Sequence, residues 1–215
     1  YNFARGLYKA ERWLQAEEAF RQFQAKFPKH EQIPFGKLYL GLSQIQLEKH
    51  SAGRDTLEVF IKDYPENTDV AHARYRVAEC SYYLDELERA ENDFTNCLKD
   101  FPKDPFREFA LFYLGDTQRR LGKSEKAVAS LQDSINLFPQ GRMAVEARFG
   151  LAQATEAAGD SEKALLLYRE AAKSSPENRG DAAQLAIANL LFSQRKFQQA
   201  VDEYEAVGTR FPKSR

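Results

Sequence analysis

The residues best suited to chemistry are three histidines, two cysteines and one acidic run. His30, His50 and His72 fall in different segments of a repeating pattern, at different places within it. A metal site or an imidazole-based active site needs its ligating or proton-transferring groups within bonding reach of one another. We therefore expect the fold to hold the three histidines apart, with no shared metal site.

The cysteines and carboxylates have simpler structural interpretations. Cys80 and Cys97 occupy positions that hold serine, threonine or alanine in neighbouring repeats, which predicts small buried thiols. A disulfide between them stays open, because it needs Cα atoms within about 7 Å of each other. The acidic run beside Arg89 is predicted to be a solvated helix face rather than an acid–base pair, and consists of Glu86, Glu88, Glu91 and Asp93.

No catalytic motif occurs elsewhere in the sequence. It contains no glycine-rich phosphate loop, no His-Glu-x-x-His and no Cys-x-x-Cys. We expect no catalytic residue, no metal and no cofactor, and hence no enzyme. The charge is nearly balanced, with 31 Lys+Arg against 32 Asp+Glu, which argues against nucleic acid as a partner. No apolar run approaches the ~18 residues that predict a membrane span.

The elements that carry these residues follow from an aromatic–proline repeat. The prolines are separated by 37, 37, 37, 37 and 36 residues, and Ser175 replaces the aromatic residue in the fifth pair. The pairs are Phe27-Pro28, Tyr64-Pro65, Phe101-Pro102, Phe138-Pro139, Ser175-Pro176 and Phe211-Pro212. With 43% apolar residues, the chain has enough hydrophobic material for a continuous core.

Alignment on the prolines reveals a small-residue column and a large-residue column. The small residues stand 24 positions before each proline: Ala4, Gly41, Ala78, Gly115, Ala152 and Ala188. The large residues stand eight positions before it: Phe20, Leu57, Phe94, Leu131, Tyr168 and Tyr204. Small residues allow two helix axes to approach, and large residues fill the adjacent space. Each repeat is therefore predicted to be a pair of packed helices.

The fourth and fifth repeats show how each helical hairpin should turn. The fourth should contain helices at about 105–121 and 124–137. Gly122 and Gly159 suit the left-handed conformation that ends a helix. Ser124 and Ser161 are predicted to be the following N-caps. The prolines should prevent continuation into the next repeat.

The small column, the Ala-x-x-x-aromatic signal and the closing proline resemble the tetratricopeptide repeat (TPR). The resemblance implies an all-α fold: a right-handed superhelical solenoid of about six helix-turn-helix repeats with a period of 37 residues. We expect one array over 1–215, cut from a longer protein. Its repeats should span about 1–28, 29–65, 66–102, 103–139, 140–176 and 177–212.

The connection after each proline is longer than usual, as in "YPENTDVAHARYRV" and "FPKDPFREFALFYL". This form resembles TPR proteins of the bacterial envelope: the lipoprotein partner of the outer-membrane barrel-assembly machinery and the periplasmic coordinator of the Tol–Pal system. It implies a periplasmic or envelope-associated location. A cytoplasmic location is the alternative.

In TPR arrays, the first helices of successive repeats line a concave groove. The resemblance therefore implies a groove for a protein or peptide partner. Its predicted residues are Arg5, Tyr8, Tyr39, Leu42, Arg76, Glu79, Tyr83, Tyr113, Asp116, Arg120, Gln153 and Asn189. The Lys, Asn and Arg clamp that binds C-terminal carboxylates in some relatives is absent, since Leu38, Leu42, Tyr75 and Glu79 stand at such positions.

The expected function is a protein–protein interaction scaffold, within a bacterial envelope complex. The alternative is a regulatory or positioning array of a larger multidomain enzyme. The last repeat also carries an apolar stripe of Phe197, Val201, Tyr204 and Val207, so homo-oligomerisation through exposed repeat ends is a further expectation.

Overall fold

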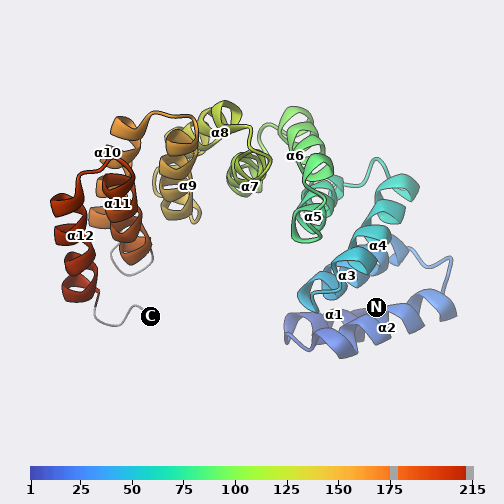
Figure 1. Ribbon diagram of the computed structural model, residues 1–215. Coiled ribbons are helices and arrows are strands. Elements are labelled where there is room, and N and C mark those ends of the chain that lie inside the picture. Colours follow the sequence, from blue (N-terminus) through green and yellow to red (C-terminus); the bar gives the residue numbers. More distant parts are fainter. Residues whose placement is uncertain (175–178, 212–215) are drawn as a thin grey trace. The chain divides into compact units, whose positions relative to one another are not determined.

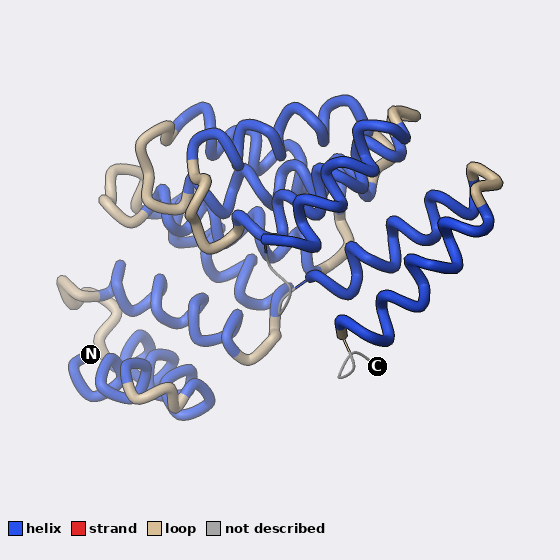
Figure 2. The backbone as a smooth tube through the Cα atoms, turned by 90° about the vertical axis from the view of Figure 1, so that its left-hand side faces the viewer, coloured by secondary structure: helices blue, strands red, loops and turns tan. Residues whose placement is uncertain are grey.

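The computed structural model describes residues 1–174 and 179–211, which form twelve α-helices and no strand (Figure 2). The helices are α1 (Asn2–Lys9), α2 (Trp13–Lys26), α3 (Ile33–Gln46), α4 (His50–Asp63), α5 (Val70–Tyr83), α6 (Leu87–Asp100), α7 (Arg107–Arg120), α8 (Ser124–Leu137), α9 (Ala144–Ala157), α10 (Ser161–Ser174), α11 (Asp181–Ser193) and α12 (Phe197–Arg210). None of them, over these residues, is long and apolar enough to cross a membrane.

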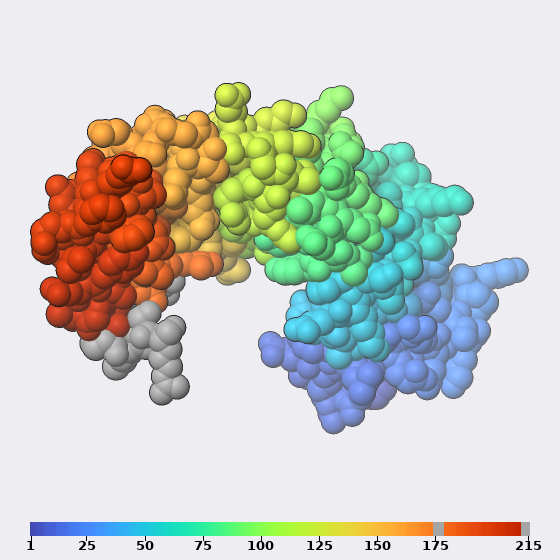
Figure 3. All heavy atoms as spheres, viewed as in Figure 1, coloured from blue at the N-terminus to red at the C-terminus, as the bar shows by residue number. Residues whose placement is uncertain are grey.

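The chain divides into two compact units, Tyr1–Ala110 (unit 1) and Leu111–Arg215 (unit 2), and α7 crosses the division. In unit 1, consecutive helices pack together from α1 to α6, and α3 also contacts α1 and α5 (Figure 1). In unit 2, consecutive helices pack together from α8 to α12, so that successive hairpins lie side by side (Figure 3). The predicted all-α helical repeat solenoid is confirmed.

The turn inside each hairpin agrees with the sequence prediction at its glycines but not at its caps. Gly122 and Gly159 have φ values of +71° and +91°, as expected for left-handed residues. Ser124, however, is the first residue of α8, and Lys123 holds the cap position without a side-chain cap. At α10, Asp160 Oδ1 accepts the backbone N–H of Lys163 at 3.1 Å. The serine-cap prediction is wrong because the residue directly after the glycine already occupies the cap.

The left-handed position recurs in the other four repeats without glycine. Its occupants are Glu11, Glu48, Asp85 and Arg195, with φ of 56°, 59°, 62° and 60°. A side chain in this conformation brings its Cβ close to the following carbonyl oxygen, which costs about 1–2 kcal/mol per residue. Four of the six hairpin turns therefore carry backbone strain.

The two helices of each hairpin meet at the small-residue column. The type of small residue in a repeat is matched to the type of large residue in the same repeat. A methyl group at Gly41 would lie 2.7 Å from Leu57 Cγ, and one at Gly115 would lie 2.5 Å from Leu131 Cγ. Each glycine thus faces a leucine, and each alanine of the column stands in a repeat whose large residue is aromatic: Ala4 with Phe20, Ala78 with Phe94, Ala152 with Tyr168 and Ala188 with Tyr204. A leucine branches at Cγ, where the facing helix passes, whereas a flat ring leaves room for a methyl group.

Successive hairpins of unit 1 are joined by ion pairs. Glu17 on α2 accepts from Lys49 Nζ at 2.7 Å, and Arg54 on α4 donates to Glu86 at 2.5 Å. Each of these pairs links a second helix to the start of the next second helix, and the sign of the charges reverses from one junction to the next. Glu17 and Arg54 are both buried.

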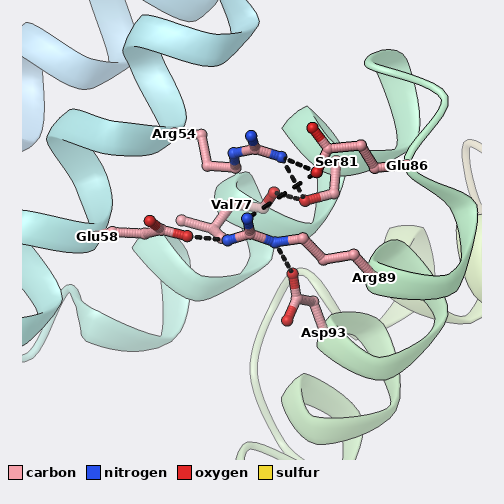
Figure 4. Close-up of polar contacts among 7 residues, drawn as sticks. All are labelled: Arg54, Glu58, Val77, Ser81, Glu86, Arg89 and Asp93. Atoms are coloured by element: carbon pink, nitrogen blue, oxygen red, sulfur yellow. Dashed lines mark hydrogen bonds and ion pairs between the residues drawn. The ribbon is translucent and has the colours of Figure 1, made fainter.

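Two residues of the acidic run, Glu86 at the N-cap of α6 and Asp93 within α6, lie at the second of these junctions (Figure 4). Arg89 forms ion pairs with Glu58 of α4 and with Asp93, and Glu86 holds Arg54. Burial raises the pKa of Asp93, and the charge of Arg89 opposes that rise. Glu86 and Glu88 are exposed, as predicted for a solvated face, whereas Glu91 and Asp93 are half-buried. Glu86 also has a partner that the prediction did not include, Arg54, which stands about one repeat earlier in the sequence.

The two cysteines are buried and free, as predicted for core thiols. Burial raises the pKa of Cys80 and of Cys97 to about 12 in each case. Both thiols therefore stay protonated at neutral pH and lack the thiolate needed for nucleophilic or metal chemistry.

We predict that Gly41→Ala lowers the free energy of unfolding by about 1–3 kcal/mol, because the new methyl group overlaps Leu57. Combining it with Leu57→Phe should recover most of the loss, because the pair then matches the alanine–aromatic hairpins. Urea unfolding of the two single variants and the double variant measures the coupling. Gly208→Ala is the control: no atom lies within 4 Å of the added group, and a small gain is expected. Additive effects in the double variant would disprove the pairing rule.

The left-handed column gives a second prediction. Glu48→Gly should raise the free energy of unfolding by about 0.5–1 kcal/mol, since glycine relieves the strained φ at the cost of some chain entropy. Gly122→Ala should lower it by a similar amount. Thermal and urea unfolding would measure both changes. If the two substitutions change the free energy of unfolding in the same direction, the left-handed residues are not strained.

Candidate functional site

In unit 1, aromatic rings from the first helices form a continuous cluster. Tyr8 of α1 packs edge-on against Trp13 at 4.9 Å and against Tyr39 of α3 at 5.0 Å between ring centroids. Tyr39 stacks on Phe20 at 5.9 Å. Tyr8 and Tyr39 are half-buried, so part of each ring remains at the surface. The rings are fixed by one another and by the core beneath them.

The next part of the surface is built by α5 and the residue that precedes α7. His72 stacks on Phe106 at 4.3 Å, and the buried Tyr75 stacks on the same ring at 5.0 Å. The guanidinium of Arg76 lies over Tyr75 at 5.4 Å and over Phe106 at 5.8 Å. These cation–π contacts hold the charged group flat against aromatic carbon.

A carboxylate fixes this arginine from below. Arg76 Nη1 donates to Glu79 Oε2 at 2.7 Å, and Tyr75 Oη donates to Glu79 Oε1 at 2.9 Å. Arg76 Nε donates to His72 Nε2 at 3.2 Å, so His72 must be neutral at that nitrogen. Burial, helped by the charge of Arg76, lowers the pKa of His72 to about 4. At neutral pH, His72 is therefore a neutral acceptor beside the guanidinium.

Arg76 also connects the two groups of rings. Burial raises the pKa of Tyr8, and the positive charge of Arg76 opposes that rise, so the phenol of α1 lies within the field of the α5 guanidinium. The surface thus runs from α1 through α3 to α5. We call it the first-helix face, defined by Tyr8, Tyr39, His72, Arg76 and Phe106.

The remaining predicted groove residues of unit 1 have different positions. Arg5 is exposed on α1, three residues before Tyr8, and therefore lies on the same side of the helix at the edge of the first-helix face. Tyr83 is 51% exposed and stacks on His50 at 5.0 Å. Leu42 and Glu79 are only 5% and 7% exposed. Leu42 lies in the core cluster against which Tyr8 and Tyr39 pack, so it supports the first-helix face from beneath.

Two charged candidates and one aromatic candidate lie on α7, in unit 2. Tyr113 is half-buried and packs edge-on against Phe112 at 5.3 Å. Asp116 Oδ1 accepts two hydrogen bonds from Arg119, at 2.9 and 2.7 Å. Arg120 is exposed at the end of the helix. Asp116 therefore pairs with an arginine of its own helix.

The last two candidates lie farther along unit 2. Gln153 is half-buried on α9. Asn189 is exposed on α11, and its Oδ1 accepts a hydrogen bond from Tyr204 Oη at 2.6 Å.

Two residues of the first-helix face, His72 and Phe106, were not among the predicted groove residues. His72 shares its repeat position with Phe35 and Phe109, and this aromatic column was a usable signal. Phe106 stands where neighbouring repeats have Gln32, Asp69 and Met143, so no column indicated it. Its role follows only from the loop after Pro102, which brings its ring into stacking contact with both His72 and Tyr75.

The first-helix face encloses no cavity for a small molecule. The hollow lined by Tyr75, Phe101 and Phe106 has a volume of about 10 Å³, which is room for a single water at most. Within the described part of the chain, no group of three His, Cys, Asp or Glu residues is placed to hold a metal ion. The geometry fits a ligand that lies across a surface.

Comparison with known proteins identifies the fold. A sequence profile described as tetratricopeptide repeat matches residues 112–179, and a second profile with the same description matches residues 37–67 and 182–214. No curated protein matches the sequence.

Solved structures give the same answer. A tetratricopeptide repeat protein from Parabacteroides merdae has a TM-score of 0.76 and 18% identity, over 97% of this chain and 77% of that one. MamA from Desulfovibrio magneticus has a TM-score of 0.72 and 14% identity, over 82% and 94%. YrrB, described as a TPR protein with an unusual peptide-binding site, has a TM-score of 0.69 and 14% identity, over 92% and 94%.

At these identities, the structural likenesses show the fold alone. The two profile matches together cover more than half of the chain and agree with the helical hairpins, the small–large columns and the closing prolines. The chain belongs to the tetratricopeptide-repeat superfamily.

Proposed function

We propose that the chain is a protein-interaction scaffold whose first-helix face binds an extended segment of a partner protein. The observation that carries this proposal is the fixed cluster of half-exposed rings around Arg76, in which stacking and ion pairing hold every side chain in place. Tyrosine and arginine dominate the energy of protein interfaces, and side chains fixed before binding lose little entropy when a partner arrives.

The charges of the face define the chemistry of the segment. Arg5 and Arg76 are positive, His72 is neutral, and the carboxylate of Glu79 is buried beneath Arg76. A segment with a carboxylate flanked by apolar or aromatic residues would pair with the arginines and cover the rings. The peptide-binding site for which YrrB is described supports this kind of use of the fold.

A bacterial envelope complex is the proposed setting. Its support is the long proline-led connection between repeats, present in residues 64–70 and 101–107, which resembles that of envelope TPR proteins. Fractionation of the source cells, with detection of the native protein, tests this part separately from the binding proposal.

To test the binding face, we would select peptides from a random display library against the full chain and measure their affinity by calorimetry. Arg5→Glu combined with Tyr8→Ala should weaken binding by about tenfold or more, as expected for an interface hot spot. The matched control, Val59→Ala with Lys62→Glu, makes the same kinds of change at exposed positions of the second helix α4.

Both double variants should keep the helical circular dichroism of the parent chain. If Tyr8→Ala lowers the melting temperature, Arg5→Glu alone serves as the test, because its side chain is exposed. If the α4 control variant weakens peptide binding as much as the Arg5/Tyr8 variant does, or if only the control weakens it, the peptide binds outside the first-helix face.

A further inference from the structure

Unit 2 contains a hollow between two successive second helices. Helices α10 and α12 form its walls, and α11, which packs against both, forms its floor. Its volume is about 530 Å³, which lies within the usual size of small-ligand sites. We call it the second-helix groove, defined by Arg169, Lys173, Gln184, Glu203 and Arg210.

The same repeat positions form a smaller hollow in unit 1. It lies between α4 and α6, over α5, and has a volume of about 220 Å³. Arg74 and Asp93 line it at the repeat positions of Gln184 and Glu203. Another repeat follows this junction in the sequence, so the groove is a property of the contact between two repeats and does not depend on where the array ends.

In unit 1, the charges at the edge of this groove are paired within each hairpin. Lys37 Nζ lies 2.5 Å from Asp63 Oδ2, and Arg74 Nη1 lies 2.8 Å from Asp100 Oδ2. In both pairs, the cation lies in the first half of a first helix, and the aspartate is the last residue of the following second helix. The side chains of these aspartates are 40% and 43% exposed although another repeat follows each of them.

The sixth repeat changes both members of this pair. Gln184 stands in the place of the cation, and Arg210 stands in the place of the aspartate. Arg210 Nη1 donates to Gln184 Oε1 at 3.0 Å, and Gln184 Nε2 donates to Glu203 Oε2. Gln184 is only 1% exposed, so a buried neutral amide fixes the guanidinium. The contact therefore orients Arg210 without neutralising its charge.

A second position of the same groove reverses its charge. Arg169 stands at the repeat position of Glu58, which in unit 1 pairs with Arg89. Lys173 follows Arg169 by four residues, so both cations lie on the side of α10 that lines the groove. The groove thus gathers three cations, and its one described carboxylate is that of Glu203, which lies 4.0 Å from Arg169.

We propose that the second-helix groove binds a phosphate monoester that carries an apolar group. Such an ester has close to two negative charges at neutral pH and three terminal oxygens, which match the charge excess and the three cationic side chains of the groove. Arg169 and Lys173 of α10 and Arg210 of α12 hold the phosphoryl oxygens from both walls. The apolar group contacts Ile187 on the floor and the half-buried ring of Phe211.

Calorimetry of the full chain with phenyl phosphate tests this proposal. Arg210→Asp restores the acidic residue of the second and third repeats and should weaken binding by about tenfold or more, since it removes a charged hydrogen-bond donor. Arg169→Glu restores the residue of the second repeat and should have the same effect. Both positions are exposed, so both variants should keep the circular dichroism of the parent. Arg142→Asp, at an exposed position outside the groove, is the matched control and should bind like the parent.

Two further probes define the ligand. Benzoate has the same ring but a single charge, so it should bind about tenfold more weakly than phenyl phosphate, or weaker still. A peptide that contains phosphotyrosine distinguishes two sources of the ester. Tighter binding of this peptide than of phenyl phosphate indicates a phosphorylated side chain of a partner protein, and equal or weaker binding indicates a free small ester.

The proposal is overturned if phenyl phosphate does not bind the parent chain, or if benzoate binds as tightly. It is also overturned if Arg142→Asp weakens binding as much as Arg210→Asp does. Peptides selected on the first-helix face should bind the Arg210→Asp variant as tightly as the parent, because that face lies in unit 1. The two proposals can therefore fail separately.

Discussion

The fold depends on how closely the two helices of a hairpin approach each other at one small residue. Where that residue is glycine, the facing leucine occupies the space that a Cβ would need, and where it is alanine, the repeat supplies a flat ring. The same large side chain then packs against the first helix of the next hairpin, as Phe20 does with Leu40. One side chain thus sets both the spacing inside a hairpin and the spacing between hairpins, and an error at this position affects two interfaces.

The first-helix face is a consequence of this packing. Burying one side of α1, α3 and α5 leaves the other side of each helix at the surface, where successive repeats place their rings next to one another. Tyr8 and Tyr39 rest on the core that contains Leu42. Arg76 is held by Glu79, whose carboxylate is itself fixed by Tyr75. Binding chemistry and stability are therefore coupled here, because the groups that orient the surface residues are buried.

The sequence predicted the helices of the fourth repeat to within two residues, because proline spacing and hydrophobic periodicity are local signals. It also predicted the left-handed glycines and the buried thiols. It did not predict contacts whose partner lies about a repeat away: Glu86 is exposed, as expected, but its ion pair with Arg54 was not foreseen. Phe106 was missed because its ring is positioned by a loop, which leaves no periodic trace. The pairing of glycine with leucine, and of alanine with an aromatic residue, was not predicted either. It could be recognised only once the structure showed that the two columns are in contact.

The reversal of charge between the first two junctions has an evolutionary consequence. Arrays of this kind can grow by duplication of single repeats, but here the second repeat brings Lys49 to Glu17 and offers Arg54 to Glu86. A tandem copy of that repeat would bring a second Lys49 against Arg54, two cations at a site where the arginine is buried. The polar contacts between these hairpins are therefore compatible with only one order of repeats. A recombination event that preserves every helix and every core residue would still place like charges against each other.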